Sequence, residues 1–127
     1  MRETPFYWSH GQDREELLFC MHGIGSCADA FLPQRDLADE LGYRLVAWDA
    51  PGYRYSADPT SELGIDGWAD AAAVLIISLG YERAVILGVS WGGVTATRLA
   101  IRHPKLVSAL ILADSSVGSG TNPKQAE

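Results

Sequence analysis

The chain has 127 residues and a composition that is 47% hydrophobic, which suffices for one modest globular domain with an apolar core. Its 16 acidic residues outnumber its 10 basic ones, and no run of lysine and arginine could follow a phosphate backbone, so nucleic acid is not an expected partner. The longest apolar stretch, residues 71–79, is too short to cross a bilayer and the amino end has no apolar signal block. We therefore expect no membrane association and a cytoplasmic location.

Short apolar runs alternate along the chain with segments of helical periodicity. In chain order, the expected elements are strands at 6–10 and 17–21, a helix at 31–41, a strand at 43–48, a helix at 65–79, a strand at 84–87, a helix at 94–102 and a strand at 109–113. The helix at 65–79 has the strongest pattern, because its apolar residues recur every three or four positions and Gly80 follows it. Nearly continuous apolar strands that alternate with helices predict an α/β fold, in which a mostly parallel sheet has helices on both faces.

The composition changes abruptly near the carboxyl end. Residues 116–127 turn to glycine, serine and other polar residues, so we interpret them as a linker towards a cap or cleavage region. Residues 1–115 precede this change in composition and carry every motif described below.

The two cysteines do not resemble a disulfide framework. Cys20 lies in an apolar strand and Cys27 in the following loop, and two cysteines in so ordinary a composition are expected to be free thiols. No spacing of His, Cys and Asp suggests a metal site, and no cofactor is expected.

The most informative motif is Gly88-Val89-Ser90-Trp91-Gly92-Gly93, between an apolar strand and a helix. A chain that reverses from strand to helix within one or two residues forces its central residue into a strained conformation and brings neighbouring backbones close, and glycines leave the necessary room. The serine hydroxyl is then held out at the carboxyl edge of the sheet. The adjoining helix N-terminus offers unpaired N–H groups and a partial positive charge that favour an oxyanion.

A serine hydroxyl is a weak nucleophile, so this arrangement needs a base, a group that orients the base, and N–H donors for the negative oxygen. The donors can be found here. One is the backbone N–H of Trp91, and the other is an N–H in the loop after the 17–21 strand, whose His22-Gly23-Ile24-Gly25 is small and sharply turned.

Four ordered landmarks make the chain resemble the amino-terminal half of an α/β-hydrolase, and by this resemblance residues 1–115 are the amino-terminal part of such a core. The landmarks are His22-Gly23 after one strand, Asp49-Ala50-Pro51-Gly52 after the next, the 88–93 motif, and Leu110-Ile111-Leu112-Ala113-Asp114 leading towards a cap. The resemblance implies that Ser90 is the nucleophile of a serine hydrolase, that Ile24 and Trp91 provide oxyanion N–H groups, and that Gly23, Gly25 and Trp91 line the substrate site. The implied reaction is cleavage of a small carboxylic ester, a lactone or an activated C–C bond.

The chain departs from this family on the carboxyl side of the serine. The family's order is serine, acid, histidine, yet the only histidine after Ser90 is His103, thirteen residues on and about 18–20 Å along the same helix. His103 is better explained as a favourable charge at the helix carboxyl end. Asp114, at the end of a strand, is a possible acid. No base remains, so we expect a complementary carboxyl-terminal fragment or chain to supply the remaining strands, a cap, the catalytic histidine and the acid.

Other polar residues have structural interpretations. We expect His22 to bond to loop backbone, Asp49 to hold its own turn, and Trp91 either to line a pocket or to make a core or cap contact. The remaining carboxylates of interest are expected to be cap or solvent-facing charges: Asp58, Asp66 and Asp70.

Two other functions stay open. Residues 23–28 follow a strand and match the glycine pattern of a nucleotide-binding Rossmann domain, with Asp49 placed as a ribose-binding acid would be, although Pro33 interrupts the segment where that helix should run. The other alternative is a non-catalytic, hydrolase-like binding protein in which the serine turn persists without a base.

Overall fold

The computed structural model describes residues 5–53 and 64–113 of the chain. Five strands form one sheet in the order β1-β3-β2-β4-β5, and all neighbouring strands are parallel except β1 and β3. The strands are β1 (Tyr7–His10), β2 (Glu16–Met21), β3 (Tyr43–Trp48), β4 (Ala84–Val89) and β5 (Val107–Ala113). The helices are the 3-10 helix η1 (Ala28–Gln34), α1 (Arg35–Leu41), α2 (Gly64–Ser78) and α3 (Trp91–Arg102). The predicted mostly parallel α/β sheet is confirmed.

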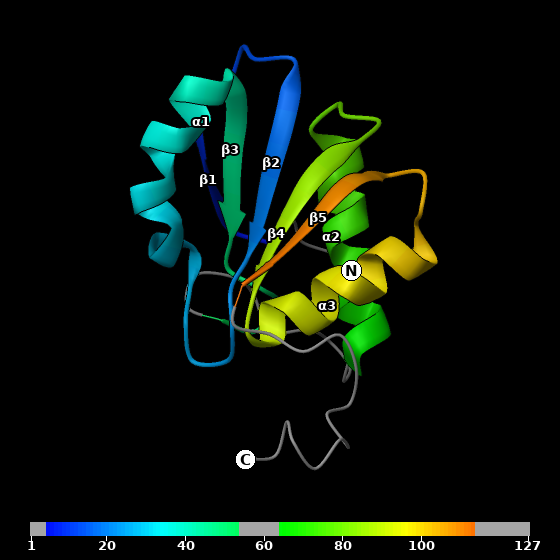
Figure 1. Cartoon of the computed structure of the whole chain (residues 1–127). Coiled ribbons are helices and arrows are strands. Elements are labelled where there is room, and N and C mark those ends of the chain that lie inside the picture. The colour runs from blue at the N-terminus through cyan, green and yellow to red at the C-terminus, as the bar shows by residue number, and fades with distance from the viewer. Residues whose placement is uncertain (1–4, 54–63, 114–127) are drawn as a thin grey trace.

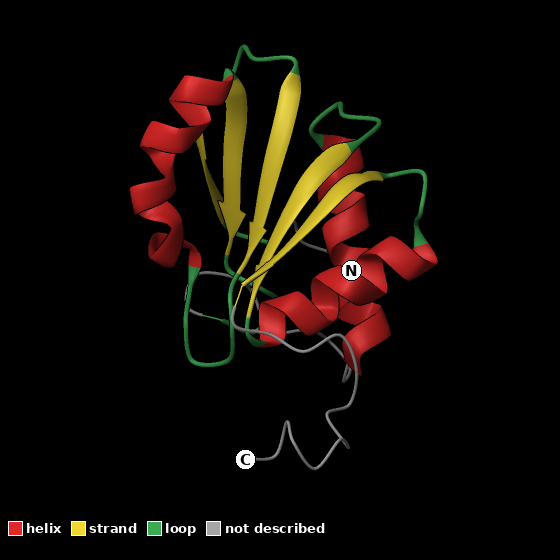
Figure 2. Ribbon diagram, in the orientation of Figure 1, coloured by secondary structure: helices red, strands yellow, loops and turns green. Residues whose placement is uncertain are grey.

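The helices lie on both sides of the sheet, with η1 and α1 on one face and α2 and α3 on the other (Figures 1 and 2). Alternate residues of the buried strands supply the two cores. Phe19, Val46 and Ile86 pack towards α2 and α3, whereas Leu18, Cys20 and Leu45 pack towards η1 and α1. Because parallel strands share one carboxyl edge, the segments that follow β2, β3 and β4 meet there.

Two helices differ from their predicted bounds. The segment 31–41 is divided, because residues 28–34 wind as a 3-10 helix that contains Pro33 and the α-helix begins only at Arg35. Proline has no N–H to donate, and a short 3-10 turn tolerates this better than a helix interior. The helix predicted to begin at residue 94 begins at Trp91, directly after Ser90. Residues 116–127, Asp58 and Asp114 lie outside the described residues.

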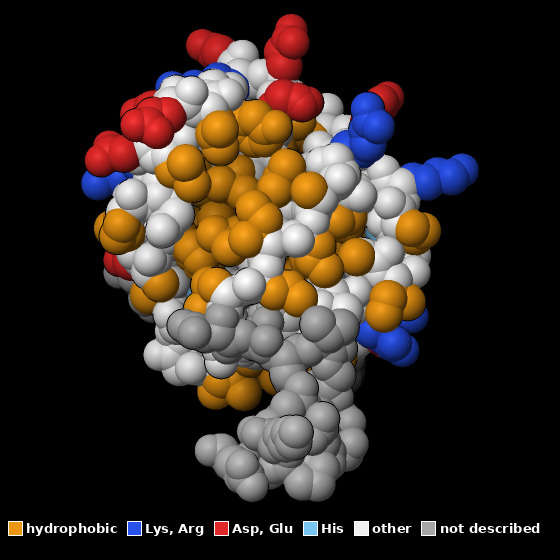
Figure 3. Space-filling view, viewed as in Figure 1, with side chains coloured by type: hydrophobic (Ala, Val, Ile, Leu, Met, Phe, Trp, Pro, Cys, Tyr) orange, Lys and Arg blue, Asp and Glu red, His pale blue; other side chains and the backbone are white. Residues whose placement is uncertain are grey.

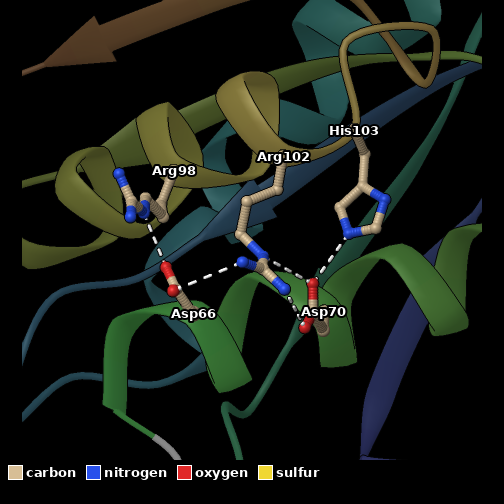
Figure 4. Close-up of polar contacts among 5 residues, drawn as sticks. All are labelled: Asp66, Asp70, Arg98, Arg102 and His103. Atoms are coloured by element: carbon tan, nitrogen blue, oxygen red, sulfur yellow. Dashed lines mark hydrogen bonds and ion pairs between the residues drawn. The ribbon is translucent and has the colours of Figure 1, made fainter.

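Asp66 and Asp70 face solvent, as expected, with 48% and 42% of their side chains exposed, but they are not isolated charges. Both lie on α2 and pair with side chains of α3 (Figure 4). Asp66 accepts from Arg98 at 2.6 Å, and Asp70 accepts from Arg102 at 2.9 and 2.8 Å and pairs with His103 at 2.8 Å. The hydrogen bond from Arg102, with a smaller effect of His103, lowers the pKa of Asp70 to about 2. The cluster ties α2 to α3, and His103 belongs to it.

Both cysteines are free, as predicted; Cys20 is buried, and burial raises the pKa of its thiol. Among the helices of the described segments, none is long and apolar enough to pass through a bilayer.

In the described part of the chain, no helix covers the β4–β5 half of the sheet on the side that carries α1. Apolar side chains gather there in a broad area on the front of the molecule (Figure 3). We call the residues of β4 and β5 on this side the open face: Val85, Leu87, Val89, Ala109, Ile111 and Ala113. Ile111 is 49% exposed. Within the described residues β5 pairs with β4 alone, so the other edge of β5 ends the sheet.

Candidate active site

Ser90 occupies the turn between β4 and α3, and its backbone is strained. Its φ of 56° and ψ of −122° make it the only non-glycine residue with a positive φ among residues 5–53 and 64–113. The conformation costs of order 1–3 kcal/mol in a residue with a Cβ, and such strain is typical of functional sites. The side chain is exposed at the carboxyl edge of the sheet, so its hydroxyl can be reached from outside the core.

The glycines on each side of Ser90 allow the turn because the backbones touch. A Cβ on Gly88 would lie 2.5 Å from the carbonyl oxygen of Gly92, and a Cβ on Gly92 would overlap the carbonyl oxygen of Met21. The first turn of α3 is thereby pressed against the end of β2. The backbone N–H of Ser90 donates to the carbonyl of Ala113 at 3.0 Å, which fixes the turn to the end of β5.

The loop after β2 reaches Ser90 from the other side. A Cβ on Gly23 would lie 3.2 Å from the Cβ and 3.5 Å from the Oγ of Ser90, so the Gly23 backbone borders the hydroxyl directly. Gly23 and Ser90 are thus brought together as predicted. Gly25, two residues on, has a φ of 77° and nothing within 4 Å of a Cβ placed on it, so the turn requires glycine there for its conformation.

Two backbone N–H groups flank this position. Those of Ile24 and Trp91 have no acceptor within the part of the chain that the structure describes. Trp91 is the first residue of α3, where the helix dipole adds partial positive charge. An oxygen that becomes negative beside the Ser90 hydroxyl would meet N–H groups from two different elements. Their roles as oxyanion donors stay a prediction.

His22 is structural, as predicted. Its ring is buried, its Nδ1 lies 2.7 Å from the carbonyl oxygen of Gly23, and its Nε2 lies 3.0 Å from the backbone nitrogen of Ala50. The expectation that Asp49 holds its own turn stays a prediction. Its buried carboxylate accepts from the N–H of Ala28 at 2.8 Å, at the start of η1, a contact with another element that the sequence did not predict.

An aromatic row that the sequence analysis did not assign to the site extends from this loop to Trp91. Tyr53 packs edge-on against His22, Trp68 of α2 against Tyr53, and Trp91 against Trp68, with ring centroids 4.9, 5.5 and 6.3 Å apart. The side chain of Trp91 therefore contacts α2. The apolar periodicity of residues 65–79 gave no sign that the face of α2 with Trp68 meets the serine turn.

None of the chain's three histidines stands beside Ser90 as a base. His10 pairs with Asp39 at the edge of the sheet, His22 bonds to loop backbone, and His103 pairs with Asp70 at the other end of α3. Across residues 5–53 and 64–113, no three His, Cys, Asp or Glu side chains gather in a way that could hold a metal ion.

Two curated proteins with sequences similar to this chain are hydrolases. The chain is 32% identical over 118 residues to a 2-hydroxy-6-oxononadienedioate/2-hydroxy-6-oxononatrienedioate hydrolase of Pseudomonas sp., a match that covers 89% of the chain and 42% of the relative. It is 36% identical over 102 residues to a 2-hydroxymuconate semialdehyde hydrolase of Pseudomonas sp. strain CF600, which covers 78% of the chain and 36% of that relative.

A solved structure, an esterase from Exiguobacterium antarcticum, superimposes with a TM-score of 0.79 at 26% identity and covers 88% of the chain and 41% of the esterase. The chain thus spans less than half the length of each of these three proteins. Residues 16–126 match the family described as the alpha/beta hydrolase fold, and they include β2 and every later strand of the sheet. The chain belongs to the alpha/beta hydrolase fold family.

Proposed function

We propose that this chain is the nucleophile-bearing, amino-terminal part of a serine hydrolase that forms an acyl-enzyme at Ser90. The observation that carries the proposal is the strained, exposed Ser90 between two N–H groups that lack an acceptor among the described residues. Backbone strain at a non-glycine residue lowers stability. The strain at Ser90 is explained if function requires an accessible hydroxyl at the N-terminus of α3.

In the proposed reaction, a base removes the hydroxyl proton while Oγ bonds to the substrate carbonyl carbon. The carbonyl π electrons move to oxygen, and the N–H groups of Ile24 and Trp91 stabilise the resulting anion. When the carbonyl re-forms, the bond to the leaving group breaks and the base, now an acid, gives the proton to that group. Water then attacks the acyl group in the same way and frees Ser90.

The substrate we propose is small and partly apolar: a carboxylic ester, a lactone or a compound with an activated C–C bond. The aromatic row of Tyr53, Trp68 and Trp91 borders the site, and the exposed Ile24 adds an apolar side chain on the loop. The names of the relatives, an esterase and two hydrolases of dienedioate and semialdehyde compounds, are consistent with this range.

The base and the acid, in our proposal, come from a complementary polypeptide that contributes the missing strands, a cap and a histidine. The three histidines of this chain have other partners. Among the described residues, the outer edge of β5 pairs with no strand and no helix covers the apolar side chains of the open face beside it. A strand added to β5 and a helix laid on the open face would cover both, and more than half the length of each relative lies outside the match.

A fluorophosphonate probe tests the nucleophile. Because fluorophosphonates phosphonylate activated serines, we expect label at Ser90, located by peptide mass spectrometry, when the carboxyl-terminal part of the strain CF600 relative is present to supply the base. We expect none in a Ser90→Ala variant under the same conditions. Label that persists in Ser90→Ala, or that falls on other serines, would exclude Ser90 as the nucleophile.

A non-catalytic binding protein remains the second candidate, because the described residues contain no base for Ser90. Turnover of a p-nitrophenyl ester separates the two. We expect slow turnover by the chain alone and faster turnover when the carboxyl-terminal part of the strain CF600 relative is added. Equal rates with and without that fragment, and with Ser90→Ala, would favour the binding protein.

A further inference from the structure

The proposed reaction leaves the buried His22 without a chemical role, although its ring lies beside the site. The side chain is 2% exposed and both ring nitrogens have backbone partners. A buried imidazole whose nitrogens had no hydrogen-bond partners would cost stability. The two hydrogen bonds of His22 remove that cost, and they also constrain the groups to which the ring is bonded.

The partners of His22 fix its tautomer. The carbonyl oxygen of Gly23 can only accept, so Nδ1 must carry the hydrogen in the 2.7 Å contact. The N–H of Ala50 can only donate, so Nε2 must present its lone pair at 3.0 Å. The ring is therefore neutral, and both of its nitrogens are engaged by backbone groups that cannot exchange roles.

The carbonyl that His22 holds belongs to the same peptide unit as the N–H of Ile24. A trans peptide is planar and its C=O and N–H point in opposite directions, so fixing one fixes the other. The N–H of Ser26 also donates to the Gly23 carbonyl, at 3.2 Å, which adds a second bond to the same oxygen. Two donors thus hold the Gly23 carbonyl, and the Cα of Gly23, which precedes this peptide, lies near the Ser90 side chain.

The turn after β3 anchors this arrangement at two points. Ala50 holds the far side of the His22 ring, and the carboxylate of Asp49, next in the chain, accepts from the N–H of Ala28 at 2.8 Å. Cys27, at the cap position of η1, makes no side-chain cap of its own, so Asp49 caps that helix from another element. The loop of residues 22–28 is therefore attached to one rigid turn at both of its ends.

We infer that His22 is a positioning residue: through the Gly23 carbonyl it orients the Ile24 N–H as an oxyanion donor, and Asp49 and Ala50 hold it in place. The inference rests on the proposed function for the use of that N–H, but the orientation itself can be measured separately. The substrate feature it serves is a carbonyl oxygen that becomes negative at the serine.

Two substitutions separate the bonds that the ring makes. In His22→Asn, the amide nitrogen on Cγ can replace Nδ1 as donor to Gly23, whereas the acceptor for Ala50 is lost. In His22→Gln, the longer amide can place an oxygen near the former Nε2 and accept from Ala50, whereas the donor to Gly23 is lost. The inference predicts that His22→Asn keeps the Ile24 N–H orientation and that His22→Gln does not.

The orientation is read from residual dipolar couplings of the Ile24 N–H in ¹⁵N-labelled chain, with those of β2 and β4 as the internal reference. We expect the Ile24 coupling to be unchanged in His22→Asn and shifted in His22→Gln. An unchanged coupling in His22→Gln, or the same shift in both variants, would overturn the inference, because either result means that the Gly23 bond does not set the peptide plane.

Binding of phenylboronic acid, monitored by ¹¹B NMR, tests whether the Ile24 N–H stabilises a negative charge at the serine. The serine oxygen bonds to trigonal boron and its proton passes to the buffer, which gives a tetrahedral boronate anion that resembles the oxyanion. We expect binding to weaken by about tenfold in His22→Gln, less than the 10²–10³ cost of removing a donor outright, and to be retained in His22→Asn. Equal affinity of wild type and His22→Gln would overturn the inference.

Failure of the proposed function has a different signature. If Ser90→Ala binds phenylboronic acid as well as wild type does, or if wild type does not bind it even with the carboxyl-terminal part of the strain CF600 relative added, the serine is not the reactive group. The dipolar couplings still decide whether His22 orients the peptide in that case. Thermal unfolding of both His22 variants confirms that they are folded at the temperature of the measurements.

Discussion

Ser90 has two features that lower the stability of the fold and that a purely structural turn would avoid. A residue with a Cβ occupies a conformation that favours glycine, and its hydroxyl is left exposed instead of bonded within the core. A glycine would relieve the first cost. Serine at this position therefore lowers the free energy of unfolding but holds a hydroxyl in a fixed place. The loss of stability can be measured.

Ser90→Gly should raise the free energy of unfolding by about 1 kcal/mol, because relief of about 1–3 kcal/mol of strain exceeds the roughly 0.5–1 kcal/mol that glycine loses through its freedom in the unfolded chain. Urea denaturation measures the change. Ser90→Ala is the matched control: it removes the hydroxyl but keeps the Cβ, so its stability should stay near wild type. Equal stability of the glycine and alanine variants would mean that the turn is not strained.

Gly92→Ala should destabilise the chain by about 3 kcal/mol or more, because its new Cβ would overlap the backbone carbonyl of Met21 and neither backbone can yield as a side chain could. The control is Gly42→Ala, at the end of α1. Gly42 also has a positive φ, 73°, but a Cβ there meets nothing within 4 Å, so that variant should lose only about 1–2 kcal/mol. Similar losses in both variants would show that α3 does not press on β2.

The sequence was informative about the residues whose chemistry is local. Glycines around a serine between a strand and a helix predict the turn at Ser90, because the steric demand lies within six residues. It did not predict the bond between Asp49 and Ala28, because the N–H that this carboxylate accepts from lies 21 positions earlier. A carboxylate at a strand end fits its own turn and a neighbouring loop equally well until the sheet order is known.

At the scale of the elements, α2 and α3 are joined by charge as well as by packing. Asp66 and Asp70 face Arg98, Arg102 and His103 at the surface between the two helices (Figure 4). Apolar periodicity identified the buried stripe of α2, but pairing between helices depends on which helix lies alongside. That information is absent from either helix taken alone, so both carboxylates were assigned to solvent.

Asp70→Asn should lower stability at pH 7 by up to about 1 kcal/mol, since the pair with Arg102 is 42% exposed on the Asp70 side and solvent screens it. The native pKa of about 2 lies below the ordinary value of 3.8. The contribution is therefore fully present above pH 3.8 and is lost as the pH falls towards 2. The difference between wild type and variant, measured by chemical denaturation from pH 7 to pH 2, should shrink over that interval.

Asp36→Asn is the control for this titration, because Asp36 is exposed on α1 and makes no ion pair with the described residues. It should change stability little at any pH in the range. Added salt should also reduce the effect at Asp70, since a Debye length of about 3 Å at 1 M screens partly exposed charges. A difference at Asp70 that persists unchanged at pH 2 would have to come from packing.

At the scale of the whole molecule, the sheet is covered unevenly. Helices α2 and α3 protect one side of β4 and β5, whereas on the other side the open face has no helix among the described residues (Figures 2 and 3). The sequence predicted helices on both faces, and that is confirmed. It could not predict that η1 and α1 would stop short of β5, because coverage depends on where the chain crosses the sheet and not on the pattern of any one segment.

The open face predicts how the isolated chain behaves in solution. Ile111, on β5, is 49% exposed next to Leu87 of β4, and nearby backbone groups of β5 have no strand partner on their outer side among the described residues. Exposed apolar area beside an unpaired strand edge promotes self-association. We therefore expect the chain without its proposed complement to bind 1-anilinonaphthalene-8-sulfonate and to self-associate as its concentration rises.

Ile111→Lys should weaken both effects, because self-association through the open face would have to bury an ammonium group and would lose the apolar contact of the isoleucine. Burial of a full isoleucine side chain contributes about 1.5–3 kcal/mol, so at least about a tenfold rise in the dissociation constant is expected by analytical ultracentrifugation. Ile101→Lys, on α3, is the matched control, since Ile101 is 63% exposed but lies away from the open face. If Ile101→Lys weakened association as much as Ile111→Lys does, the contact would not be specific to this face, and the complementary polypeptide would have to be sought elsewhere on the molecule.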